Sequence, residues 1–273
     1  MMEMINAMVV QALEEDVGSG DITAQLISEN KVVTAQVMTR EPAIICGIDW
    51  VNETFRQVDK NIKITWHIKD AEQAVANQPL FEVTGNARGI LTAERTALNF
   101  LQLLSGTATT TSYYVEKIKH TKTKLLDTRK TFPLYRQAQK YAVKCGGGEN
   151  HRMGLYDMFL IKENHIASCG SITKAIAAAR SLHGDKKIEV EVENLAEYTE
   201  ALAAKPDIIM LDNFSMTDIE LAVAQRHGTI KLEVSGNVTL DNITDYAVRG
   251  VDYISVGAMT KHVRAIDLSL RIL

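Results

Sequence analysis

Two short apolar stretches of the sequence each end in a positively charged residue with hydrogen-bonding neighbours. One stretch leads into an Asp-Thr-Arg-Lys segment, the other into Lys-Glu-Asn-His, and a glycine triplet followed by Asn-His-Arg lies between them. The positively charged or chargeable residues of this region are Arg129, Lys130, His151, Arg152 and Lys162. Arginine binds carboxylates and phosphates through two parallel hydrogen bonds, and lysine supplies a point charge. The set therefore predicts a binding site for an anionic small molecule.

Acidic residues lie on later apolar stretches. Glu189, Glu191 and Glu193 alternate with apolar residues, so their side chains share one face of a strand. In a barrel the outer face of each strand is covered by helices, and the acidic face is then expected to point inward and towards the mouth. Glu191 and Asp212 would end neighbouring strands, where they could hold Mg²⁺ near a phosphate or stabilise a cationic transition state. On an exposed sheet the same residues would only form a solvated face.

The elements that position these residues are strands alternating with helices. From Leu125 onward, apolar runs alternate with helical segments at roughly 20–35 residues, which is typical of βαβ units and a parallel sheet. Six clear strands are enough for an α/β barrel, and an open doubly wound sheet is the alternative. In both architectures the site lies at the carboxyl ends of the strands. The turns after the last two strands contain Ser235, Gly236, Asn237 and Gly257, whose backbone N–H groups suit a phosphate.

The first 90 or so residues mix strands and helices, and their strands have one polar face, which predicts a separate α/β layer. Residues 91–104 have the strongest helical pattern. We expect that helix to end near Leu104, because Gly106 follows, and a second helix to cover about residues 112–120. The C-terminal residues 262–273 are expected to pack back on the first domain.

Composition excludes several classes of protein. The chain has 273 residues, with 34 acidic and 30 basic side chains, and this balance argues against a general nucleic-acid binder. No apolar run approaches the roughly 20 residues that span a bilayer, and the N-terminus lacks the features of a signal peptide. The three cysteines are far apart and show no metal-ligand spacing. They predict reduced thiols in a cytoplasmic protein.

Lys162 also permits a different chemistry. A lysine at the end of a barrel strand can form a Schiff base, as in aldolases. The neighbours of Lys162 are charged rather than apolar, so nothing in the sequence predicts the lowered pKa that this chemistry needs. An anion-binding role fits the surrounding residues better.

Several strings of the sequence resemble one family along essentially the whole chain. The strings are EDVGSGDIT, ERTALNFLQLLSG, LLDTRKT, YAVKCGGGENHR, FLIKENH, EVEVEN, IMLDNF and GVDYISVGA. They are similar, in the right order, to the quinolinate phosphoribosyltransferase family, also called nicotinate-nucleotide pyrophosphorylase (carboxylating).

The resemblance implies a reaction and a fold. The family transfers the 5-phosphoribosyl group from phosphoribosyl pyrophosphate to quinolinate, and the products are nicotinate mononucleotide, pyrophosphate and CO₂. Mg²⁺ is required, and no organic cofactor is needed. The implied fold is an N-terminal α/β sandwich, over residues 1–110, followed by an incomplete, seven-stranded α/β barrel of the type II phosphoribosyltransferase kind, over residues 111–261. Members form homodimers, or hexamers, in which the N-terminal domain of one subunit covers the barrel mouth of the other.

The resemblance also implies roles for residues by position. Quinolinate would be bound by Arg129, His151, Arg152 and Lys162, and by Arg95 from the neighbouring subunit. Lys130 and Lys162 would contact the phosphoribosyl donor and take part in catalysis. Glu191 and Asp212 would bind the ribose hydroxyls and, through the substrate, Mg²⁺, and would stabilise positive charge. The 5-phosphate would be held by Ser235, Gly236, Asn237 and Gly257.

Three departures from the family pattern concern the pocket. Phe132 replaces a threonine, Leu134 replaces a glycine, and Glu149 stands where the family has histidine. We expect Glu149 to point away from the site, because a further negative charge would weaken the binding of a dianion. Two alternatives remain at this stage: a nicotinate-using phosphoribosyltransferase, and a non-catalytic homologue of the same fold.

Overall fold

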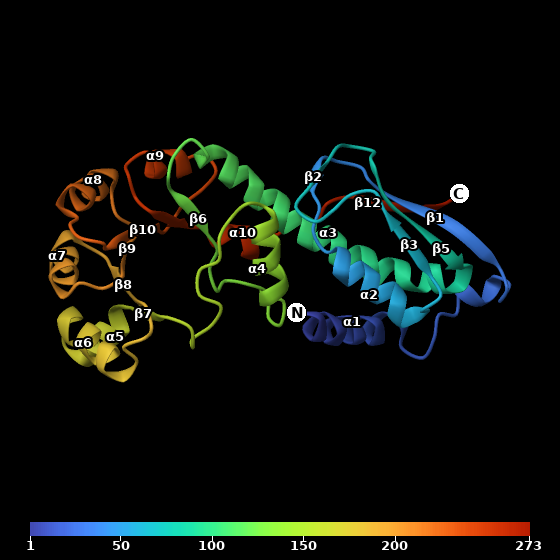
Figure 1. Cartoon of the computed structure of the whole chain (residues 1–273), viewed down its shortest axis with the longest axis horizontal. Coiled ribbons are helices and arrows are strands. Elements are labelled where there is room, and N and C mark those ends of the chain that lie inside the picture. Colours follow the sequence, from blue (N-terminus) through green and yellow to red (C-terminus); the bar gives the residue numbers. More distant parts are fainter. The chain divides into compact units, whose positions relative to one another are not determined.

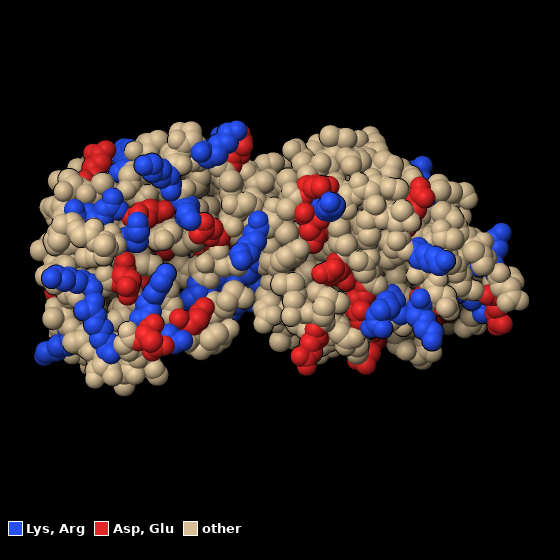
Figure 2. Space-filling model, viewed as in Figure 1, with Lys and Arg blue, Asp and Glu red and all other residues tan.

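The structure is a computed structural model that describes residues 1–273, and the chain divides into two compact units. The first comprises residues 1–110, 144–147 and 263–273, and the second comprises residues 111–143 and 148–262. None of the helices combines the length and the apolar character that crossing a membrane requires. On the face drawn in Figure 2, Lys and Arg side chains are interspersed with Asp and Glu, so no basic stripe of the kind that binds nucleic acid is visible there.

A four-stranded antiparallel sheet forms the centre of the first unit, in the order β12-β1-β5-β3. Its strands are β1 (Val32–Thr39), β3 (Lys63–Trp66), β5 (Pro79–Asn86) and β12 (Leu268–Ile272). The side chains of Ala35 and Val37 point to the same face and are fully buried, as the alternation of apolar and polar residues predicts. The C-terminal strand completes this sheet, since Ala35 pairs with Ile272.

Helices pack on the apolar face of this sheet, and shorter segments complete the unit (Figure 1). They are α1 (Met2–Val17), a 3₁₀ turn (Ala24–Leu26), β2 (Ala43–Ile44), α2 (Ile48–Val58) and β4 (Gln73–Ala74). Asp21 accepts hydrogen bonds from the backbone N–H groups of Thr23 and Ala24, which stabilises the start of the 3₁₀ turn. The carboxylate of Asp70 accepts in the same way from Gly47 and Ile48, at the start of α2.

Helix α3 corrects one expectation. It is a single helix of 32 residues, Ala87–Ile118, where the sequence predicted two helices separated at Gly106. A side-chain carbon at Gly106 would lie 2.1 Å from the carbonyl oxygen of Arg264. The glycine therefore permits a backbone to approach the helix closely, and it does not end the helix.

The second unit is built on a parallel sheet in the order β6-β11-β10-β9-β8-β7. The strands are β6 (Lys124–Leu126), β7 (Phe159–Ile161), β8 (Ile188–Val192), β9 (Ile208–Asp212), β10 (Lys231–Ser235) and β11 (Tyr253–Ser255). An isolated parallel bridge joins Leu126 to Glu149 beyond β6. Six strands and this bridge thus occupy the positions of the seven strands that the resemblance implied.

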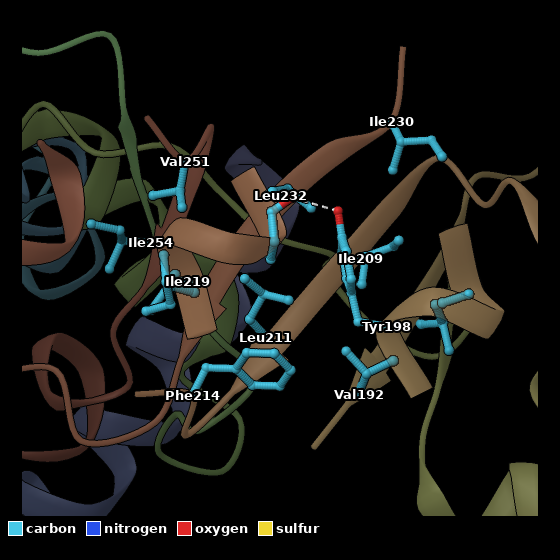
Figure 3. Close-up of a cluster of buried hydrophobic side chains, with 14 of the residues drawn as sticks. Val192, Tyr198, Ile209, Leu211, Phe214, Ile219, Ile230, Leu232, Val251 and Ile254 are labelled. Carbon is cyan, nitrogen blue, oxygen red and sulfur yellow. Dashed lines mark hydrogen bonds between the residues drawn. The ribbon is translucent and has the colours of Figure 1, made fainter. Parts of the chain in front are cut away.

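Helices follow the strands of this sheet and cover its outer face (Figure 1). They are α4 (Arg136–Cys145), α5 (Glu163–Cys169), α6 (Ile172–Leu182), α7 (Leu195–Ala204), α8 (Met216–Gln225), α9 (Ile243–Ala247) and α10 (Ala258–Lys261). Outward-facing strand residues such as Val192 and Leu211 pack there with Tyr198, Phe214 and Ile219 in one apolar core (Figure 3). The inner face of the strands is left for the polar residues of the site.

The close approach at Gly106 gives a testable prediction. Gly106→Ala should lower the free energy of unfolding by about 2 kcal/mol or more, because a backbone carbonyl cannot move aside as a side chain can. Gly89→Ala is the matched control in the same helix, since its new carbon would meet the flexible side chain of Ile62 at 3.3 Å. The free energy of unfolding of Gly89→Ala should lie within about 1 kcal/mol of the wild-type value or exceed it. Urea unfolding measures both, and equal effects would contradict this interpretation.

Candidate functional site

A cavity of about 230 Å³ lies at the carboxyl ends of the parallel strands. Its lining residues are Thr128, Arg129, Lys130, His151, Arg152, Leu160, Lys162, Glu191, Met210, Glu233, Ser235 and Ser255. Seven residues that the sequence singled out therefore meet in one pocket: Arg129, Lys130, His151, Arg152, Lys162, Glu191 and Ser235. They come from segments far apart in the sequence, which a parallel sheet brings to one edge.

Two arginines give the pocket its positive character. Arg129 follows β6, and its Nη1 atom is buried without a hydrogen-bond partner. Burial, and then the charge of the neighbouring Arg129, lower the pKa of Arg152. A buried donor without a partner is costly, and so are two adjacent like charges. An anionic ligand in the pocket would relieve both costs.

Lys162 and Glu191 form an ion pair at the mouth of the pocket. The Lys162 ammonium contacts the Glu191 carboxylate, and 40% of the lysine side chain but only 11% of the glutamate side chain is exposed. Lys162 follows β7 and Glu191 lies near the end of β8, so neighbouring parallel strands bring them together. This pairing places the Lys162 ammonium at the pocket, where it can contact a ligand, as the anion-binding interpretation requires.

His151 has a different environment from the one that the sequence predicts. Its Nδ1 atom accepts a hydrogen bond from the backbone N–H of Arg152, at 2.8 Å. A ring nitrogen that accepts carries no proton, so the imidazole is neutral and Nε2 bears the hydrogen. Burial lowers the pKa of this histidine, although Glu233 opposes the shift. His151 is therefore not part of the cationic set in this conformation.

Beneath the pocket lie two fully buried carboxyl groups, Glu189 and Glu233. The Nε2 atom of His151 lies 2.9 Å from a carboxyl oxygen of Glu189 and 3.6 Å from one of Glu233. Burial raises the pKa of Glu189 to about 8, and burial together with the charge of Glu189 raises the pKa of Glu233 to about 8. At neutral pH these two carboxyl groups are protonated, so they place no negative charge beneath a site that binds an anion.

Sequence analysis did not single out Glu233. The sequence does contain a pattern that could have identified it. Glu233 stands between the apolar residues Leu232 and Val234 on β10, and the same alternation identified the acidic face of β8. Three ligand atoms of His151, Glu189 and Glu233 lie within 4.8 Å of one another, a spacing that suits a metal ion. The Nε2 atom that faces the glutamates carries a hydrogen, however, and metal binding requires a free lone pair there. The Nε2 atom of His151 and the carboxyl oxygens of both glutamates are buried without a hydrogen-bond partner, and the geometry does not favour a metal site.

The residues expected to bind phosphate surround the ends of β9, β10 and β11. Ser235 lines the cavity, whereas Gly236, Asn237 and Gly257 do not. A side-chain carbon at Gly236 (φ +91°) would lie 2.1 Å from Oδ1 of Asn213, so only glycine fits there. That Oδ1 atom also accepts from the Asn237 amide, at 3.0 Å. At Gly257 an added carbon would meet the Lys130 side chain at 3.0 Å.

Two other residues singled out by the sequence lie outside the cavity lining. Asp212, half-buried at the end of β9, accepts a hydrogen bond from the Asn213 amide at 2.8 Å and pairs in register with Ser235. Arg95 is exposed on α3, within the first unit.

The departures flagged in the sequence lie on exposed segments. Glu149 points away from the pocket, as expected, because its carboxylate pairs with Lys124 at 2.6 Å. Leu134 has a positive φ of 62° and is 88% exposed. The backbone at Leu134 thus adopts the conformation for which glycine is best suited, and the leucine costs about 1–2 kcal/mol there. Phe132 is 38% exposed and does not line the cavity.

The raised pKa of Glu233 predicts how stability depends on pH. Unfolded, this carboxyl titrates at about 4.3, whereas in the folded protein its pKa is about 8. The folded state then holds more protons than the unfolded state between these values, so the wild type loses stability as the pH rises through this window, by up to about 1.4 kcal/mol per unit. Glu233→Gln lacks this loss, and its stability relative to wild type should rise from pH 5 to 8 and then level off. Urea unfolding at each pH measures both proteins. If their free energies of unfolding change with pH in parallel, Glu233 does not have the raised pKa.

The sequence matches the models of one protein family along most of its length. The model of the quinolinate phosphoribosyl transferase N-terminal domain matches residues 21–105, and that of the C-terminal domain matches residues 107–271. A nicotinate-nucleotide pyrophosphorylase [carboxylating] of Mycobacterium leprae is 43% identical, over 95% of this chain and 94% of its own. The probable enzyme of that name from Methanocaldococcus jannaschii is 45% identical, over 96% and 95%.

The fold agrees as well. The solved structure of the nicotinate-nucleotide pyrophosphorylase from Francisella tularensis superposes with a TM-score of 0.98, at 55% identity, and covers 100% of this chain and 97% of that one. Human nicotinic acid phosphoribosyltransferase has a TM-score of 0.63 at 12% identity, which shows a related fold alone. Both domain models match in order and together cover most of the sequence, and the chain therefore belongs to the quinolinate phosphoribosyl transferase family.

Proposed function

We propose that this protein transfers the 5-phosphoribosyl group from phosphoribosyl pyrophosphate to the ring nitrogen of quinolinate and that it releases pyrophosphate and CO₂. The product is nicotinate mononucleotide, a precursor of NAD. One observation carries the proposal: Arg129, Arg152 and Lys162 converge on one pocket, and the Nη1 atom of Arg129 has no partner within the protein. A planar dicarboxylate offers four oxygens, which suit two guanidinium groups and an ammonium.

The transfer step calls for two kinds of charge. Displacement of pyrophosphate at the anomeric carbon passes through an oxocarbenium-like state, as in glycoside chemistry. Glu191, which lines the pocket, and Asp212 would stabilise that positive charge. Lys130, exposed at the pocket, would contact the departing pyrophosphate. Ser235, together with the turns of Gly236, Asn237 and Gly257, would hold the 5-phosphate.

Decarboxylation uses the charge that the first step creates. Once the ribose is attached, the pyridine nitrogen is quaternary, and its positive charge stabilises the electron pair left at C2 when CO₂ departs. A proton from water then adds at C2 and gives the product. The proposal therefore needs no organic cofactor. The arginines would bind the carboxylate that remains and so keep the ring in place.

Mg²⁺ fits the acidic residues of the proposed site. Oxygen ligands from one or two carboxylates, completed by substrate oxygens, are the usual environment of this ion. Glu191 and Asp212 would hold it through the substrate, and the ion would neutralise charge on the pyrophosphate.

We also propose a homodimer in which Arg95 of one subunit completes the quinolinate pocket of the other. Arg95 is exposed on its own unit and has no ion-pair partner among those that the structure records, so it is free to contact a second chain. We further propose that the protein is cytoplasmic, because none of Cys46, Cys145 and Cys169 forms a disulfide, as is usual in a reducing compartment.

The deciding experiment offers quinolinate and nicotinate separately, with phosphoribosyl pyrophosphate and Mg²⁺. Nicotinate mononucleotide and CO₂ should form from quinolinate alone. Arg152→Ala should raise the KM for quinolinate about 100-fold, because a charged hydrogen bond to the dianion is lost. Turnover of nicotinate alone would move the assignment to a nicotinate-using enzyme, and turnover of neither substrate would support a non-catalytic homologue.

The position of Glu149 gives a separate prediction. Glu149→His should change the KM for quinolinate by less than about twofold, because the carboxylate pairs with Lys124 outside the pocket. Steady-state kinetics of both proteins at fixed phosphoribosyl pyrophosphate measure this. A KM lowered tenfold or more would mean that Glu149 repels the substrate.

A further inference from the structure

A buried ion pair lies behind the pocket and outside its lining. Asp127 directly follows β6, Lys140 lies on α4, and the two side chains contact each other with 0% and 1% of their surface exposed. Burial raises the pKa of Asp127 and lowers that of Lys140, so the interior disfavours the charge on each. Buried ion pairs of this kind seldom stabilise a protein more than apolar residues of the same size would. The pair therefore calls for a reason beyond stability.

The ion pair holds one peptide segment from both sides. The carboxylate of Asp127 accepts a hydrogen bond from the backbone N–H of His151, at 2.9 Å. The ammonium of Lys140 donates to the carbonyl oxygen of the same residue, at 3.0 Å. Asn150 adds two more hydrogen bonds, from its amide to the Asp127 carboxylate and to the Lys140 carbonyl. Both backbone polar groups of His151 are thus bound by a single buried pair.

The residue that follows needs such support. Arg152 lies beside Arg129, and its pKa is lowered first by burial and then by repulsion from the Arg129 guanidinium. Within the protein, the Arg152 guanidinium makes one long hydrogen bond, at 3.4 Å to the carbonyl of Met158. A mobile backbone would let this side chain swing away into solvent, where water screens the repulsion. A fixed His151 peptide keeps the guanidinium directed into the pocket.

We propose that Asp127 and Lys140 are positioning residues for the anion pocket, which act by clamping the His151 peptide so that Arg152 is preorganised for the ring dicarboxylate. The inference rests on the proposed function, because it names quinolinate as the ligand that Arg152 grips. The residues proposed to bind the 5-phosphate lie at the ends of β10 and β11, outside the clamp. Loss of the clamp should therefore affect the binding of the two substrates differently.

The test compares Lys140→Met, Asp127→Asn and the double variant in thermal unfolding and in steady-state kinetics with each substrate. Lys140→Met leaves a buried carboxylate unpaired and should lower Tm by about 5 °C or more. The double variant removes both charges, and its Tm should recover most of that loss. Its KM for quinolinate should still be raised about tenfold, whereas its KM for phosphoribosyl pyrophosphate stays within about twofold of wild type.

Asp252→Asn is the matched control. Asp252 likewise combines ion pairs, to Arg226 and Lys231, with a hydrogen bond from a backbone N–H, that of Leu232 at 3.0 Å. It lies at the opposite, amino-terminal edge of the same sheet, where β11 begins. This variant should lose stability while both KM values stay within about twofold of wild type.

Each outcome is decisive. A double variant whose quinolinate KM returns to wild type as Tm recovers would show that the pair is only structural, and so would an equal rise in both KM values. Should the Lys140 variants fail to fold, Asn150→Ala tests the same clamp, and its quinolinate KM should rise about threefold with little change in Tm. If the wild type does not use quinolinate, the proposed function fails and this inference fails with it. If the wild type does use quinolinate, the kinetics of the variants test the positioning role alone.

Discussion

Parallel pairing of six short strands is the constraint on which the rest of the second unit depends. Parallel hydrogen bonding requires every strand to run in the same direction, so all carboxyl ends meet at one edge of the sheet. Residues separated by more than a hundred positions, such as Arg129 and Ser235, thereby line one cavity. The helices cover the outer face, which leaves the inner face to polar side chains. The pocket follows from topology, and its chemistry follows from which residues end each strand.

Charge compensation then determines how that edge is organised. Lys162 is paired with Glu191, and Lys140 with Asp127, as buried or half-buried charges require. Glu189 and Glu233 avoid the cost of burial in another way, because they hold protons near neutral pH. Arg129 is left with a buried nitrogen atom that lacks a partner. The pocket carries a positive excess that only an anionic ligand can compensate, which agrees with a substrate bearing two carboxylates.

The departures from the family pattern leave this balance intact. Glu149 is neutralised by Lys124 outside the pocket. Leu134 keeps the backbone conformation of the glycine it replaces, at some cost in strain, and its side chain points to solvent. Changes on the loops around a rigid pocket are thus tolerated where they do not alter the charges that face the ligand.

The sequence by itself determined the order of strands and helices, the cationic residues at the strand ends and the family, because these depend on local periodicity and on residues close together in the chain. It did not determine the length of α3, because the reason for Gly106 is the distant carbonyl of Arg264. Nor did it reveal the neutral state of His151 or the buried Glu233, because a pKa depends on burial and on neighbours that only the folded sheet brings together. Tertiary structure alone decided which charges are paired, which are protonated and which remain for the ligand.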